Sequence, residues 1–86
     1  MKQENLKTIR EYLGLSQNQL GVKLKELSGY GSRQLVAKME AGNTPIKEHT
    51  ELAITKLVKE HTPIVDLDEF AKTLNTVYSN KPNKAK

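Results

Sequence analysis

The side chains best suited to recognise a nucleic acid lie close together in the stretch from Ser32 to Lys38. Arg33 can donate two hydrogen bonds to the edge of a guanine base, and Gln34 can form a pair of hydrogen bonds with adenine. Lys38 lies four residues after Gln34, so the two side chains would share one face of a helix, from which the lysine reaches a base or a phosphate. Ser32 can cap the first turn of that helix through its hydroxyl group. These residues predict base recognition by the start of a short helix.

A second helix start precedes this one, at Ser16. Gln19 follows three residues later, a spacing typical of a capping box, in which each side chain bonds the backbone N–H group of the other residue. Gly21 supplies the small residue that a helix needs where it passes close to another backbone. The turn over residues 29–31 then leads to the short helix, which is expected to end at Gly42. The pattern predicts a helix-turn-helix pair.

Three further helices are expected around this pair. The first would cover residues 3–13 at the start of the chain. A fourth would run over residues 45–60, because Pro45 has no N–H group and is favoured at the first position of a helix. A fifth would begin at Asp66, which forms another capping box with Glu69.

The chain is therefore expected to be all-α, with five helices in one domain over residues 1–79. No segment alternates apolar and polar residues in the way a strand requires. Residues 80–86 are rich in Asn, Lys and Pro and are expected to form a disordered basic tail. The residues expected to be buried in the first three helices recur at helical spacing: Leu6, Ile9 and Leu13; Leu20, Leu24 and Leu27; Leu35, Val36 and Met39. The apolar residues of the fourth helix keep the same spacing and those of the fifth form an amphipathic stripe: Ile46, Ala53, Ile54, Leu57 and Val58; Leu67, Phe70, Ala71, Leu74, Val77 and Tyr78.

The composition limits the classes of function. A chain of 86 residues can form one small core but not two lobes with a substrate cleft between them. The absence of cysteine excludes disulfides, zinc fingers and thiol nucleophiles. No apolar run suits a signal peptide or a membrane span, so a cytoplasmic protein is expected. His49 and His61 have no further ligand at a suitable spacing, so we expect neither a metal, a cofactor nor catalysis.

Positive charge is concentrated in the first half of the chain. Residues 1–45 carry seven Lys or Arg against four Glu, a net charge of +3, whereas residues 46–80 carry four Lys against six acids, a net charge of −2. Three lysines at the end of the chain bring the total to +4. The basic half is the one that contains the expected helix-turn-helix pair, and this placement favours a nucleic-acid partner.

These motifs resemble the helix-turn-helix domains of phage repressors and Cro-like proteins, also called the xenobiotic response element family. The resemblance extends from about Leu6 to Leu57 and rests on the sequences at 13–17, at 19–21 and at 32–42. It implies a lambda-repressor-like fold in which the second helix of the pair reads the major groove.

The resemblance also implies roles for individual residues. Arg10 and Glu40 would form a partly buried ion pair that joins the first helix to the end of the third, so Arg10 is expected to be structural. Gln17, at the start of the second helix, and the loop residues Asn43 and Thr44 would contact phosphates. The expected DNA-binding residues are thus Gln17, Ser32, Arg33, Gln34, Lys38, Asn43 and Thr44.

One departure from the family is the distance between the two helices of the pair, which is about five residues longer than usual, over residues 25–29. Either the second helix is longer and Leu27 adds to the core, or the extra residues form a loop beside the recognition helix. Tyr30, in the turn, is expected to fold back onto the core rather than to stack on a sugar or phosphate.

Together these features predict a transcriptional regulator that binds double-stranded DNA sequence-specifically, with repression the favoured mode. Its operator is expected to be an inverted repeat bound by a homodimer. The apolar stripe of the fifth helix could close the monomer core, form the dimer seam, or do both. The alternative is a protein-interaction module, such as an antitoxin or an anti-factor, that binds its partner through the acidic surface of the fourth and fifth helices.

Overall fold

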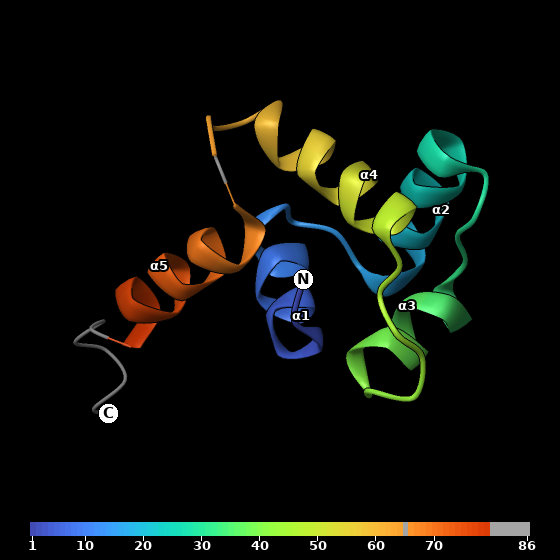
Figure 1. Ribbon diagram of the computed structural model, residues 1–86, viewed down its shortest axis with the longest axis horizontal. Coiled ribbons are helices and arrows are strands. Elements are labelled where there is room, and N and C mark those ends of the chain that lie inside the picture. The colour runs from blue at the N-terminus through green and yellow to red at the C-terminus, as the bar shows by residue number, and fades with distance from the viewer. Residues whose placement is uncertain (65, 80–86) are drawn as a thin grey trace.

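The computed structural model describes residues 1–64 and 66–79, with side chains up to residue 76 (Figure 1). Within these residues the chain is all-helical and contains no strand, which confirms the predicted all-α class. The helices are α1 (Gln3–Tyr12), α2 (Gln17–Ser28), α3 (Arg33–Glu40), α4 (Glu48–Lys59) and α5 (Leu67–Ser79). The disordered tail expected over residues 80–86 lies outside the described residues, and so do the side chains of Val77 and Tyr78, the last two members of the apolar stripe expected on the fifth helix.

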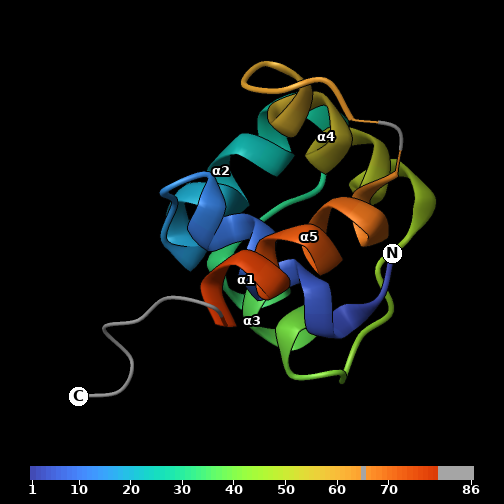
Figure 2. The same cartoon turned by 90° about the vertical axis from the view of Figure 1, so that its left-hand side faces the viewer.

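The five helices enclose one small core. The contacts between elements join α2 to α3, α2 to α4, α1 to α3 and α1 to α5. Figure 1 shows α5 on the left, α1 in the middle and α2 and α3 on the right, with α4 above them. In Figure 2, which views the molecule from the α5 side, α5 lies in front of α1. The buried apolar residues are Leu6, Ile9, Leu20, Leu24, Val36, Met39, Ala53, Ile54, Leu57, Val58, Leu67 and Ala71.

The predicted starts of α2 and α3 are confirmed. The Gln19 N–H group donates to the Ser16 hydroxyl at 3.1 Å, and the Ser16 N–H group donates to the Gln19 side-chain oxygen at 2.9 Å. At the next helix the Leu35 N–H group donates to the Ser32 hydroxyl at 3.0 Å. Both serines therefore satisfy N–H groups that a helix start would otherwise leave without an acceptor.

The predicted start of α4 is wrong by about one turn. Pro45 lies outside the helix, which begins at Glu48 after an extended backbone at Lys47. Ile46 packs against the core from this extended segment, and that contact favours an extended chain over an earlier helical turn. The helix preference of a proline at a first position is small enough for such a tertiary contact to override it.

Burial was also overestimated at three apolar positions. Leu13 caps α1 instead of extending it and is half-buried, and Leu35 is half-buried as well. Leu27, in the last turn of α2, is 41% exposed and does not belong to the core. These residues keep the helical spacing of their neighbours but lie at the margin of the surface that the other helices cover.

Asp68 at the start of α5 fastens that helix to α1. Its carboxylate accepts a hydrogen bond from the Lys2 N–H group at 2.9 Å and another from the Asn5 side chain at 2.8 Å. Burial alone would raise the pKa of Asp68, but these two hydrogen bonds and nearby positive charge outweigh it and hold the pKa below its ordinary value. The ionised carboxylate therefore contributes to the packing of α5 on α1.

Replacement of Asp68 by asparagine is expected to lower the free energy of unfolding at neutral pH by about 1 kcal/mol, because a neutral amide is the weaker acceptor. Since the folded-state pKa is lowered, the contribution of the carboxylate is complete above the ordinary value of 3.8 and is lost as the pH falls through the folded-state pKa. Urea unfolding at a series of pH values should show that the free energies of unfolding of the wild type and Asp68→Asn become equal in acid. Glu69→Gln removes an exposed charge from the same turn and is the control; a constant difference between wild type and Asp68→Asn would contradict the assignment.

Candidate functional site

The helix α2 and the segment that leads into α3 meet at a point where neither has room for a side chain. A Cβ atom on Gly21 would lie 2.6 Å from the Ser32 carbonyl oxygen and 2.7 Å from the Arg33 nitrogen. A Cβ atom on Gly31 would collide with the Gly21 carbonyl oxygen and with the backbone of Lys25. The first contact was predicted from the sequence, and the second was not. Two glycines thus let the start of α3 rest directly on the backbone of α2.

The long connection between these helices is mostly an extension of α2. The helix continues to Ser28, and Gly29 ends it in the left-handed conformation with φ 81°. Of the two alternatives left by the sequence, the longer helix is therefore the observed one, although its Leu27 stays largely exposed. The Ser28 hydroxyl donates a hydrogen bond to the Leu24 carbonyl oxygen at 2.8 Å and fixes this last turn.

The outer face of α3 presents three polar side chains to solvent. Arg33, Gln34 and Lys38 are exposed, and none of them has a hydrogen bond or ion pair with another side chain among the described residues. On the opposite side of the helix Val36 and Met39 are buried in the core. The core contacts thus hold α3 in place while the three side chains remain available to a ligand.

The other predicted contact residues flank this face. Ser32 is exposed, and its hydroxyl oxygen is engaged in capping α3. Asn43 is exposed in the loop that follows α3, where its N–H group donates to the Lys38 carbonyl oxygen at 2.9 Å. Thr44 beside it is half-buried. The structure therefore places Ser32 before the first turn of α3 and Asn43 directly after its last.

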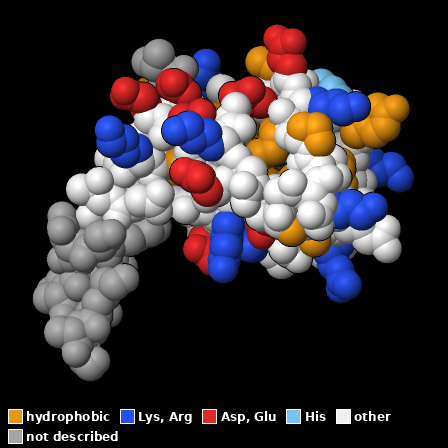
Figure 3. Space-filling model, turned by 60° about the horizontal axis from the view of Figure 1, so that its bottom comes forward, with side chains coloured by type: hydrophobic (Ala, Val, Ile, Leu, Met, Phe, Trp, Pro, Cys, Tyr) orange, Lys and Arg blue, Asp and Glu red, His pale blue; other side chains and the backbone are white. Residues whose placement is uncertain are grey.

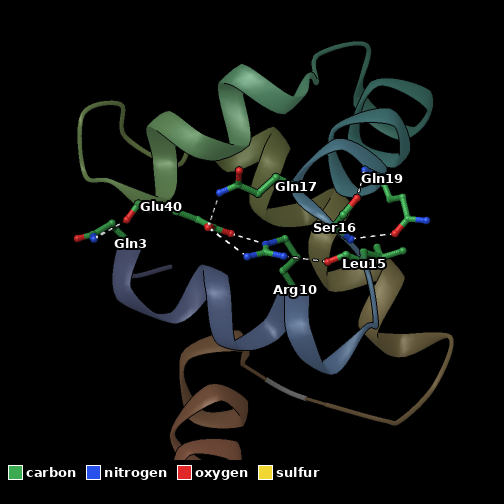
Figure 4. A network of polar contacts seen from close by, with 7 residues as sticks. All are labelled: Gln3, Arg10, Leu15, Ser16, Gln17, Gln19 and Glu40. Carbon is green, nitrogen blue, oxygen red and sulfur yellow. Dashed lines mark hydrogen bonds and ion pairs between the residues drawn. The ribbon is translucent and has the colours of Figure 1, made fainter.

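A polar network holds the end of α3 against α1 and α2 (Figure 4). The Arg10 side chain lies between the helices, with its Nε donating to Glu40 at 2.6 Å and its Nη1 donating to the Leu15 carbonyl oxygen at 3.0 Å. The side chains of Arg10 and Glu40 are only 12% and 10% exposed. The ion pair that the family resemblance implied is present, and Arg10 has the expected structural role.

Gln17 belongs to the same network, which the sequence did not indicate. Its side-chain amide donates to the Glu40 carboxylate at 2.9 Å and is therefore held at the contact between α2 and the end of α3 (Figure 4). The backbone N–H groups of Gln17 and Asn18 have no acceptor within the described part of the chain. A phosphate could therefore be bound at the start of α2 by these N–H groups, with the amide of Gln17 serving to position the helix.

The surface around α2 and α3 is basic. Residues 16–47 contain five Lys or Arg and two Glu, a net charge of +3, and one of these acids is Glu40, which is already paired with Arg10. Figure 3 shows Lys and Arg side chains projecting along the right-hand side of the face in view, whereas most of the acidic side chains lie further left. This distribution attracts a polyanion to the side of the molecule that carries α3.

Tyr30 lies on the surface, contrary to the expectation from the sequence. Its side chain is 67% exposed and does not fold back onto the core as expected. It packs against the imidazole ring of His49, with the ring centroids 5.4 Å apart. The two flanking glycines gave no indication of this contact, because the histidine comes from the start of α4.

Neither a membrane span nor a metal centre is found among the described residues. No helix in residues 1–64 and 66–79 is both long and apolar enough to cross a membrane. In the same residues no group of three or more His, Asp or Glu side chains is arranged so that it could hold a metal ion.

Comparison with known proteins adds no assignment to this geometry. The site is defined by the exposed face of α3, the N–H groups at the start of α2 and the basic surface around them. No protein-family model, no curated protein and no solved structure matches the chain.

Proposed function

We propose that the protein binds double-stranded DNA sequence-specifically through a helix-turn-helix pair of the phage repressor and Cro-like type, with α3 in the major groove. The observation that carries the proposal is the group Arg33, Gln34 and Lys38, exposed on α3 without partners among the described residues. A polar outer face is common to surface helices, and what favours DNA here is the kind of side chain: Arg33 and Gln34 can each make paired hydrogen bonds with a base edge. A dimer on an inverted repeat would then occlude a promoter, which makes the protein a transcriptional regulator.

The roles of the residues follow from their chemistry and position. Arg33 and Gln34 lie in the first turn of α3, where side chains of a major-groove helix meet base edges, and they suit guanine and adenine. Lys38 and Asn43 lie at the far end of α3 and would contact phosphates, as would the N–H groups at Gln17. Ser32 and Thr44 would add hydroxyl contacts to the same backbone.

The proposal is tested by selecting binding sites from a pool of random duplexes and then measuring affinity at increasing salt. DNA binding predicts an enriched sequence and a slope of log affinity against log salt of about −0.9 for each phosphate neutralised. An enriched palindrome would add support for a dimer. If no sequence is enriched and no salt-dependent binding occurs, the proposal fails, and the protein-interaction alternative gains support.

Replacing Arg33 by alanine is expected to weaken binding to the selected site by about 2 kcal/mol and to relax the preference at one base pair, since a bidentate contact to a base is lost. Arg33→Lys keeps the charge but not the paired hydrogen bonds, so it should retain most of the salt slope and still lose the preference. Lys72→Ala, on α5, is the control for general charge. Fluorescence anisotropy measures the affinities. Unchanged affinity and preference for both Arg33→Ala and Gln34→Ala would show that α3 does not read the bases.

A further inference from the structure

An apolar groove lies between α2 and α4, and none of the residues proposed to contact DNA lines it. Its volume is about 470 Å³, and it has two large exposed apolar side chains, Leu27 at 41% and Leu52 at 61% exposure. The groove is lined by Leu27, Ser28, His49, Leu52, Ala53, Thr55, Lys56 and Lys59. A single exposed leucine is ordinary, but two that share one groove mark a surface that another molecule can cover.

Two opposite charges of α4 lie at equal distances along the helix from Leu52. Glu48 lies four residues before Leu52 and Lys56 lies four residues after it, so the three side chains share one face of the helix. Both charged residues are exposed, and neither forms an ion pair within the part of the chain that the structure describes. A negative charge, an apolar centre and a positive charge thus follow one another at equal spacing.

This sequence of charges along α4 is complementary to a second, antiparallel copy of the same helix. If a twofold axis passes through Leu52 at right angles to α4, the two copies of the helix run antiparallel, and each position before Leu52 faces the matching position after it. Glu48 of each copy then lies opposite Lys56 of the other, on both sides of a central pair of Leu52 side chains. Leu27 from α2 would cover the apolar contact from the side.

The predicted dimer seam on α5 offers less apolar surface in its described part. Leu67 and Ala71 are buried in the monomer core, and Phe70 is half-buried against Tyr12, with ring centroids 5.0 Å apart. Leu74 is half-buried, and among the side chains that the structure describes no large hydrophobic residue of α5 is exposed. The described part of α5 therefore serves mainly to close the monomer.

We propose that the groove between α2 and α4 binds a second copy of this chain, forming a homodimer about a twofold axis near Leu52. The charge order along α4 selects this occupant over an unrelated protein, because it matches its own antiparallel copy. The inference concerns association of the free protein and does not depend on DNA binding.

Sedimentation velocity without DNA, over a range of protein concentrations, tests the proposal. The wild type is expected to shift from monomer to dimer, and Leu52→Gln should raise the dissociation constant by roughly tenfold or more, as for the loss of a central apolar contact. Val22→Gln changes an exposed apolar residue of α2 outside the groove and should leave the constant unchanged. A wild type that stays monomeric, or a dimer that survives Leu52→Gln, would overturn the proposal.

A charge exchange distinguishes the twofold contact from other uses of the groove. Glu48→Lys and Lys56→Glu should each weaken the dimer by about fivefold, because like charges then face each other across the axis. The double variant, which reverses both charges, should have the same dimer dissociation constant as the wild type. Circular dichroism confirms that each variant is folded. Two single variants as tight as the wild type, or a double variant as weak as either single one, would show that α4 does not pair with itself.

Discussion

Replacement of Gly21 by alanine is expected to lower the free energy of unfolding by about 3 kcal/mol, as overpacking of a close contact does. The added Cβ atom would lie within 2.7 Å of backbone atoms of Ser32 and Arg33, and neither can rotate away as a side chain would. The helices α2 and α3 must then separate, and this movement displaces the start of the proposed recognition helix. Affinity for a selected DNA site should fall with it. Urea unfolding and anisotropy measure the two effects.

A loss of stability in Gly21→Ala would be informative, because helix propensity alone predicts that this change stabilises the protein. In an uncrowded helix interior, alanine in place of glycine stabilises by up to about 1 kcal/mol. Asn18→Ala, at an exposed position of the same helix, is the control and should be close to neutral. A Gly21→Ala protein as stable as the wild type would mean that α2 and α3 are less closely packed than described.

Replacement of Glu40 by alanine is expected to cost about 3 kcal/mol of folding stability, because it leaves a nearly buried guanidinium without its counter-charge. Arg10 would lose two of its hydrogen bonds and keep the one to the Leu15 carbonyl oxygen. The side-chain amide of Gln17 would lose its acceptor as well. The end of α3 would then be less firmly attached to α1, as urea unfolding should show.

A double-mutant cycle separates the contribution of the ion pair to folding stability from the effect of lost packing. Arg10→Met with Glu40→Leu removes both charges while keeping apolar volume, and it should cost less than the sum of the two single changes. Glu40→Gln, which keeps the shape and one acceptor, should fall between the wild type and Glu40→Ala. Additive effects of the two single changes would indicate that Arg10 and Glu40 contribute separately.

The sequence predicts those features of the fold that depend on residues close together along the chain. The hydroxyls of Ser16 and Ser32 begin α2 and α3 as expected, because a cap acts within one turn. The exposure of Arg33, Gln34 and Lys38 follows from the same local periodicity. The Arg10–Glu40 pair is different, since its partners are thirty residues apart and only the family resemblance pointed to it.

The features that escaped prediction involve distant partners. Gln17 contacts Glu40 across 23 residues, and Tyr30 contacts a histidine of another helix, so neither contact has a local signal. The start of α4 was placed too early because the local preference of Pro45 was outweighed by packing. The tight fit at Gly31 likewise depends on the path of α2, which the sequence left as one of two alternatives.

The short length of α3 has a further consequence. At eight residues it falls below the roughly 12 to 15 at which an isolated helix becomes even marginally stable in water, so its neighbours must supply its helicity. They hold it at both ends, through the backbone of Gly21 at the first residue and through Arg10 at the last. The conformational entropy of this helix is therefore lost when the chain folds. A ligand that binds its outer face meets a preorganised surface and need not order the backbone beneath it.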